Sequence, residues 1–95
     1  MKKILLITIF LITTCQSFAS DQNFFDQAKN LFDDKKYKES KFLFQRNIVY
    51  NPKDARAYLY LAKIFKIEED KYEEEKNINT TLLLDPKNEE AMYLL

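Results

Sequence analysis

The stretch from Asp54 to Ile67, DARAYLYLAKIFKI, decides the fold of this 95-residue chain. At roughly 100° per residue, its apolar side chains cover most of the circumference of a helix. The cations Arg56, Lys63 and Lys66 remain to face water, in a stripe about 80° wide. A helix this apolar must be packed on three sides, so we expect a helix before it, a hairpin partner after it and a further layer beyond.

A tetrapeptide that contains proline occurs on both sides of this stretch. Asn51-Pro52-Lys53-Asp54 returns as Asp85-Pro86-Lys87-Asn88, and the second proline follows the first at a spacing of 34 (86 − 52). Proline has no amide hydrogen and ends the preceding helix, whereas Asp54 or Asn88 can accept hydrogen bonds from the free amides that begin the next one. Each tetrapeptide therefore predicts a joint between two helices.

Five helices are expected when the chain is followed outward from these joints. They span about Gln22 to Asp33, Lys38 to Tyr50, Ala55 to Ile67, Tyr72 to Leu84, and Glu89 to the end of the sequence. Charged turns at 33–36 and 68–71 separate the helices of each hairpin. The fourth helix has the weakest pattern, because Ile78 is the single apolar residue in 73–81 and Asn77, Asn79, Thr80 and Thr81 are mediocre helix formers.

The period, the prolines and several other residues resemble the tetratricopeptide repeat family, whose two-helix units of about 34 residues stack into a right-handed solenoid. The matching positions are Phe24 and Tyr58 for a large aromatic, Ala28 and Ala62 for a small residue, Tyr37 at the start of the second helix, Phe44 and Ile78 for a later apolar residue, and Pro52 and Pro86 for the proline. The resemblance implies an all-α, right-handed α-α superhelix over 20–95, with repeats at 21–54 and 55–88 and a partial repeat at 89–95.

Some positions depart from the family pattern. They are Gln27 in an apolar place, Lys35 and Glu69 in place of the usual turn glycine, and Ser40 where alanine is typical. The spacing from Phe65 to Tyr72 is also one residue longer than that from Leu31 to Tyr37. The second unit is therefore expected to hold an extra residue.

The segment 1–19 has the composition of a secretory signal peptide. Lys2 and Lys3 form a positive segment, Ile4 to Ile12 is an apolar run interrupted only by Thr8, and Ala19 offers a small residue for cleavage. This run of nine residues is too short to span a bilayer, which needs about 20 apolar residues. Export to the periplasm or cell envelope is therefore favoured over a membrane anchor or a plain first helix.

Cys15 is the single cysteine of the chain and lies just past the apolar run. It could accept a lipid, as in an outer-membrane lipoprotein, although the residues before it, Ile12 to Thr14, match a lipoprotein signal poorly. Otherwise Cys15 leaves with the signal peptide, and the mature chain has no thiol for disulfides or metal binding.

Composition argues against catalysis and against nucleic-acid binding. The chain has no histidine, which excludes Ser-His and Cys-His pairs and histidine metal ligands. It has no glycine for a phosphate-binding loop, and without Lys2 and Lys3 its 13 basic and 15 acidic residues give a net charge of −2. The acidic run 68–75 lacks the turn residue of a calcium loop and is interpreted as a solvated turn. We expect a protein that is not an enzyme and has no metal or cofactor.

The resemblance also implies where a partner binds, since the first helix of each unit lines the concave surface in this family. The corresponding residues are Gln22, Phe25, Lys29 and Phe32 in the first unit and Arg56, Leu59, Lys63 and Lys66 in the second. The implied function is a protein–protein interaction module whose cationic, partly aromatic groove holds a peptide segment with carboxylates and an apolar anchor. Alternatively, the lysines are ordinary solvated side chains, and Phe25 and Phe32 are buried between helices.

Residues 91–95 begin a third unit that has no second helix in this sequence. Either the chain belongs to a longer protein, or Met92, Tyr93 and Leu95 form an association surface. The second possibility gives an alternative function, in which the chain is a structural repeat element that associates with itself as a homo-oligomer. An assembly component made of envelope lipoproteins is the other form of this alternative.

Overall fold

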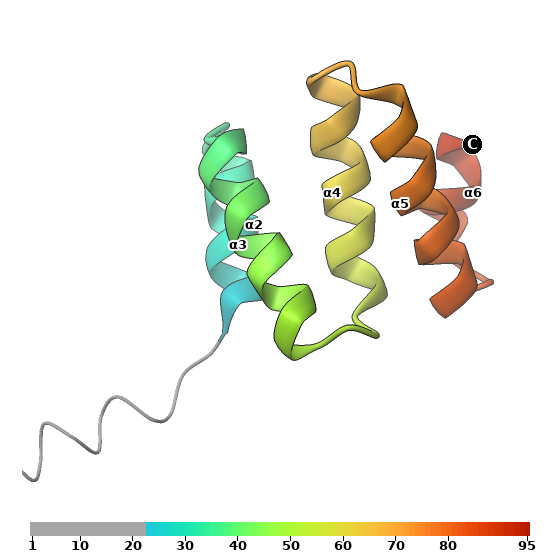
Figure 1. Cartoon of the computed structure of the whole chain (residues 1–95), viewed down its shortest axis with the longest axis horizontal. Coiled ribbons are helices and arrows are strands. Elements are labelled where there is room, and N and C mark those ends of the chain that lie inside the picture. Colours follow the sequence, from blue (N-terminus) through green and yellow to red (C-terminus); the bar gives the residue numbers. More distant parts are fainter. Residues whose placement is uncertain (1–22) are drawn as a thin grey trace, which may run out of the picture.

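The computed structural model describes residues 23–95, and these residues form helices and no strands. The helices are α2 (Phe24–Asp33), α3 (Tyr37–Tyr50), α4 (Ala55–Ile67), α5 (Lys71–Leu84) and α6 (Glu89–Leu94). α2 pairs with α3 and α4 pairs with α5 as two helical hairpins, α3 packs on α4, and α6 lies against α5 (Figure 1). The all-helical prediction is confirmed for this part of the chain. The predicted signal peptide and Cys15 lie outside the described residues.

The two proline-containing joints have the predicted geometry. In each, a backbone hydrogen bond of 3.1 Å runs from the amide of the fourth residue to the carbonyl of the first. The Asp54 carboxylate then accepts from the Arg56 amide at 3.2 Å, and the Asn88 side chain accepts from the Ala91 amide at 2.9 Å. Both residues are N-caps, so each joint ends one helix and begins the next.

The turns inside the two hairpins also share one conformation. Lys35 and Glu69 have positive φ angles of 63° and 62°. The amide of the following residue donates to a carbonyl in the last turn of the helix, at 2.9 Å from Lys36 to Leu31 and at 2.9 Å from Asp70 to Phe65. This left-handed helix ending normally uses glycine, because a side chain at positive φ is strained. Both hairpins therefore adopt the left-handed turn without glycine, at the cost of backbone strain at Lys35 and Glu69.

The second helix of each hairpin begins at the same distance from the proline that follows it. α3 begins at Tyr37 and α5 at Lys71, which is the same spacing as between the two prolines, so the extra residue expected in the second unit is not there. Tyr72 was the expected counterpart of Tyr37, but its side chain is 74% exposed, whereas Tyr37 packs against the core. The counterpart of Ser40 is consequently Glu74.

Tyr60 of α4 joins the two hairpins. Its ring stacks on Phe44 of α3, with centroids 5.1 Å apart, and meets the edges of two rings of α2, Phe32 at 5.1 Å and Phe25 at 5.8 Å. The buried core cluster consists of Phe25, Ala28, Phe44, Ala57, Leu61, Ile64 and Phe65. More than half of this cluster belongs to α4, which is therefore the central element that the sequence predicted.

α5 forms despite its poor helix formers. The side chains of Asn77, Thr80 and Thr81 each donate to the backbone carbonyl four residues earlier, at 2.8–2.9 Å. Asn77 and Thr81 are buried with Ile78, and these bonds satisfy their polar groups. Packing against α4 thus fixes a helix that its intrinsic propensity alone would not.

Candidate interaction surface

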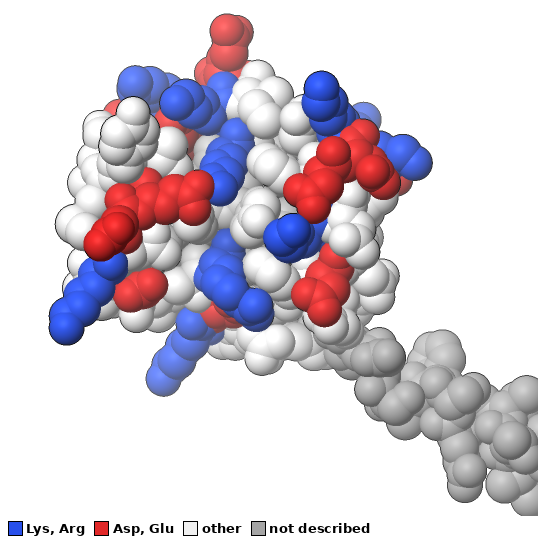
Figure 2. Space-filling model, turned by 180° about the vertical axis from the view of Figure 1, so that it is seen from behind, with Lys and Arg blue, Asp and Glu red and all other residues white. Residues whose placement is uncertain are grey.

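α2, α4 and α6 contribute charged side chains to one side of the molecule. In the view of Figure 2, basic side chains run down the middle of the face and acidic side chains lie on both sides. Two contacts connect the helices on this side. Arg56 of α4 lies over the Phe25 ring of α2, and Lys63 of α4 pairs with Glu90 of α6. We call this surface the α4 face.

Arg56 is held by both a carboxylate and an aromatic ring on the α4 face. Its Nε and one terminal nitrogen donate to the two oxygens of Asp54, both at 3.0 Å, and its guanidinium carbon lies 3.8 Å from the centroid of Phe25. The hydrogen bond to Asp54 raises the pKa of Arg56. Burial would raise the pKa of Asp54, but the hydrogen bonds from Arg56 and Asn47 outweigh it and lower the pKa below 3.8. Arg56 therefore presents a fixed guanidinium whose side chain is still 64% exposed.

The other cations of the α4 face differ in their pairing. Lys29 pairs with Asp33 at 3.1 Å, and the hydrogen bond raises the pKa of Lys29. Lys63 pairs with Glu90, while Lys66 is exposed and has no ion pair within residues 23–95. The surface is thus mixed in charge, and the expectation of a cationic groove is corrected: acids on the same and neighbouring helices offset every cation of the face except Lys66.

The predicted apolar residues of the groove contribute more to the core than to the surface. Phe25 and Leu59 are 8% and 6% exposed, and Phe32 is half-buried against Tyr37 and Tyr60. Gln22 lies outside the described residues. The structure shows Phe25 buried between helices, so the predicted groove residues of α2 and α4 expose little aromatic surface.

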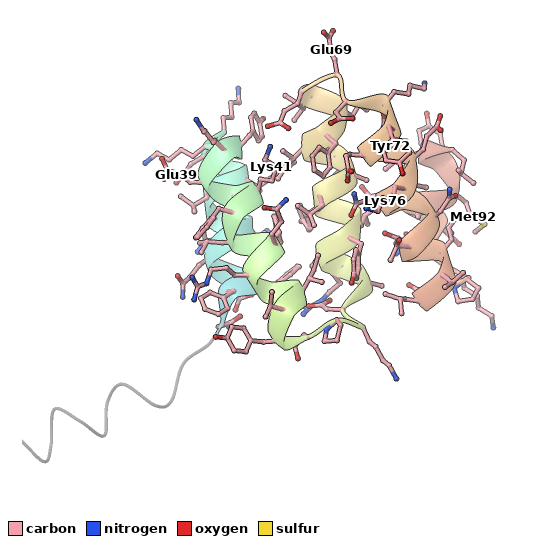
Figure 3. The ribbon with its side chains drawn as sticks, in the orientation of Figure 1. Glu39, Lys41, Glu69, Tyr72, Lys76 and Met92 are labelled. Atoms are coloured by element: carbon pink, nitrogen blue, oxygen red, sulfur yellow. The ribbon has the colours of Figure 1, made fainter. Side chains whose placement is uncertain are left out.

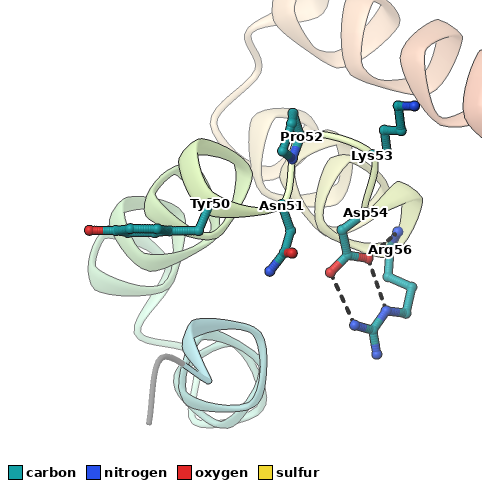
Figure 4. A pocket seen from close by; sticks show the side chains of 6 residues that line it. All are labelled: Tyr50, Asn51, Pro52, Lys53, Asp54 and Arg56. Carbon is teal, nitrogen blue, oxygen red and sulfur yellow. Dashed lines mark hydrogen bonds and ion pairs between the residues drawn. The ribbon is translucent and has the colours of Figure 1, made fainter. Parts of the chain in front are cut away.

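The structure also contains a hollow that the sequence did not point to. It has a volume of about 550 Å³, lies at the first joint, and is lined by Tyr50, Asn51, Pro52, Lys53, Asp54 and Arg56 (Figure 4). A smaller one of about 130 Å³ lies between α5 and the end of α6. The first hollow borders the α4 face through Arg56. Sequence reasoning treated the joint as a helix stop and gave no signal for its outer shape.

Two kinds of feature were not found among the residues that the structure describes. Residues 23–95 contain no cluster of three or more acidic, cysteine or histidine side chains placed to hold a metal ion. Within the same range, no helix combines the length and the apolar character needed to cross a membrane.

No family model, curated protein or solved structure matches this chain. Residues 23–95 are helical and contain no strand, and they form two hairpins with the same turn conformation, followed by a further helix. Its surfaces are accordingly the basis for assigning a function.

Proposed function

We propose that this chain is a non-catalytic protein–protein interaction module of the tetratricopeptide type, which binds a peptide segment on the α4 face in the bacterial periplasm or cell envelope. One observation carries the proposal. Equivalent helices of successive units meet on one face, where Arg56 spans from α4 to α2 and Lys63 spans from α4 to α6. The placement in the envelope rests on the signal-like sequence 1–19.

The charges of the α4 face suggest the chemistry of the partner. Arg56, Lys63 and Lys66 follow one side of α4, Asp33 lies on α2, and Glu90 lies on α6. An extended segment that crosses the three helices would place a carboxylate over α4 and basic groups toward α2 or α6. Exposed ion pairs stabilise a fold by less than about 1 kcal/mol, so a partner can exchange for them at little cost.

A peptide library provides a direct test. We would select short random peptides on phage against the chain and map the selected peptide on the ¹⁵N-labelled protein by NMR. The proposal expects enrichment of peptides that carry a carboxylate together with basic residues, and shifts in α4 and the adjacent turns of α2 and α6. Failure to enrich any sequence, or shifts confined to other surfaces, would refute it.

A second candidate function is self-association through the exposed end of the described chain. Met92, Tyr93 and Leu95 are 48%, 89% and 73% exposed, which is unusual for three apolar side chains so close in sequence. Such a surface supports a structural repeat element or an envelope assembly component. Light scattering across a concentration series decides this candidate, because a strict monomer at high concentration excludes it.

A further inference from the structure

Aromatic side chains surround one arginine on the side of the first hairpin that faces away from the core. The Arg46 guanidinium carbon lies 5.3 Å from the ring centroid of Phe24 and 5.8 Å from that of Phe42. Phe24 also stacks on Tyr50, with centroids 5.6 Å apart. Together with Val49, these residues form what we call the Arg46 patch.

The Arg46 patch leaves large apolar groups in contact with water. Phe42, Val49 and Tyr50 are 57%, 76% and 55% exposed, while α3 is anchored to the core through other residues such as Phe44. Aromatic residues and arginine are the types that carry most of the binding energy in protein interfaces. The composition of the patch thus matches a recognition surface.

The Arg46 patch continues into the hollow at the first joint, because Tyr50 belongs to both. The volume of about 550 Å³ falls in the range of about 300–1,000 Å³ that is typical of small-ligand pockets. Its wall is fixed, since Asp54 is held by Arg56 and the Tyr58 hydroxyl donates to the Pro52 carbonyl at 2.9 Å. A bound side chain would therefore meet a preformed surface and not a mobile loop.

The charges around the Arg46 patch favour an acidic occupant. Neither Arg46 nor Lys53 has an ion pair within residues 23–95, and the one carboxylate that lines the hollow, Asp54, is already neutralised by Arg56. Glu39 of α3 lies toward the other end of that helix, two turns or about 10 Å from Arg46 (Figure 3). Asp26 of α2 lies near Arg56 on the other side of the hollow, so Arg46 and Lys53 are the cations of this region that have no carboxylate partner within residues 23–95.

We propose that the Arg46 patch and the adjoining hollow form a second protein-binding surface, which takes a short segment with one apolar side chain flanked by carboxylates. The apolar side chain lies against Tyr50 in the hollow, and a carboxylate pairs with the Arg46 guanidinium. This surface shares Arg56 with the α4 face but otherwise consists of different residues. The test of this second binding surface is therefore separate from the test of the function proposed above.

Two short peptides and the full chain test this surface. The ¹⁵N-labelled protein is titrated to about 10 mM with acetyl-Asp-Phe-Asp-amide and with acetyl-Lys-Phe-Lys-amide, because contacts of this size give dissociation constants on the order of millimolar. The acidic peptide is expected to shift the amide resonances of Phe24, Arg46 and Tyr50. The basic peptide is expected to bind at least about tenfold more weakly.

Charge variants complete the test. Arg46→Glu should abolish the preference for the acidic peptide, whereas Lys76→Glu, on α5 (Figure 3), should leave it unchanged. If Arg46→Glu loses its dispersed spectrum, Arg46→Gln replaces it and should weaken the acidic peptide about tenfold.

The proposal would be overturned if both peptides caused equal shifts, or if the shifts were absent or confined to other surfaces. It would also be overturned if the resonances of the patch moved with protein concentration alone, or if they responded to phosphatidylglycerol vesicles but not to the acidic peptide. The last two would assign the patch to a second copy or to a lipid surface.

Discussion

Replacing Lys35 by glycine should stabilise this protein, although the change removes a whole side chain. Lys35 has a φ of 63°, where a non-glycine residue costs roughly 1–2 kcal/mol. Relief of this strain stabilises the folded state, but glycine offsets about 0.4–1 kcal/mol of the stabilisation because it has more conformational freedom in the unfolded chain. The net stabilisation is about 0.5–1 kcal/mol, or a rise in melting temperature of about 2–8 °C for a domain of this size. Glu69→Gly should behave alike, because its φ is 62° in the equivalent turn.

The assay is thermal and urea unfolding followed by circular dichroism. Lys36→Gly is the matched control, since Lys36 lies in the same turn with a φ of −90° and makes no side-chain cap, so glycine relieves no strain there. That control should be slightly destabilised. If Lys35→Gly melts at or below the wild-type temperature, the left-handed turn inferred for both hairpins does not exist in solution.

Three other substitutions test the packing and the joints. Tyr60→Ala should cost about 3 kcal/mol in urea unfolding, because Tyr60 fills the space between the hairpins, whereas Tyr60→Phe should be nearly silent. Ser40→Ala should lower the free energy of unfolding by about 1 kcal/mol, since the buried Ser40 hydroxyl donates to the Ala28 carbonyl at 2.7 Å. The pKa of Asp54 is lower in the folded than in the unfolded chain, so its contribution is present above the unfolded value near 3.8 and is lost as pH falls through the folded value. Asp54→Asn should therefore show a smaller loss of stability between pH 5 and 2 than the wild type does, measured by urea unfolding at each pH.

Local sequence signals were enough to predict the helices and their joints. α4 spans the predicted residues, and the caps Asp54 and Asn88 lie where the proline-containing tetrapeptides placed them. Proline and a capping side chain act within a few residues, so the chain reveals them without tertiary information. The start of α5 was missed by one residue because Tyr72 looked like the aromatic that opens α3.

The character of the candidate surface depended on contacts between helices, which the sequence does not show. Lys63 of α4 pairs with Glu90 of α6, so an acid on another helix offsets part of the stripe of cations inferred from α4 alone. Phe25 is buried because Tyr60, from the other hairpin, packs against its edge. Such pairings are decided by which faces meet, and a helical wheel of one segment cannot determine them.

The Arg46 patch could not be predicted from the sequence patterns either. Phe42 and Val49 have the spacing of an ordinary amphipathic helix and were assigned no role. Their exposure follows from the direction in which α3 packs, with Phe44 and Asn47 turned inward. Only when that direction is known can Phe42 and Val49 be placed on the exposed side of α3, where the Arg46 patch lies.

The affinity of an α4-face peptide for charge-reversed variants tests the central claim most directly. Arg56→Glu, Lys63→Glu and Lys66→Glu would be combined in one protein, with Lys38→Glu, Lys71→Glu and Lys76→Glu on α3 and α5 as the matched control. Using the peptide selected on phage, whose carboxylate is expected to lie over α4, we expect the first variant to bind on the order of tenfold more weakly or worse, and the control to bind within about twofold of wild type. Unchanged affinity of the first variant, with its helical content intact, would contradict the assignment of the α4 face.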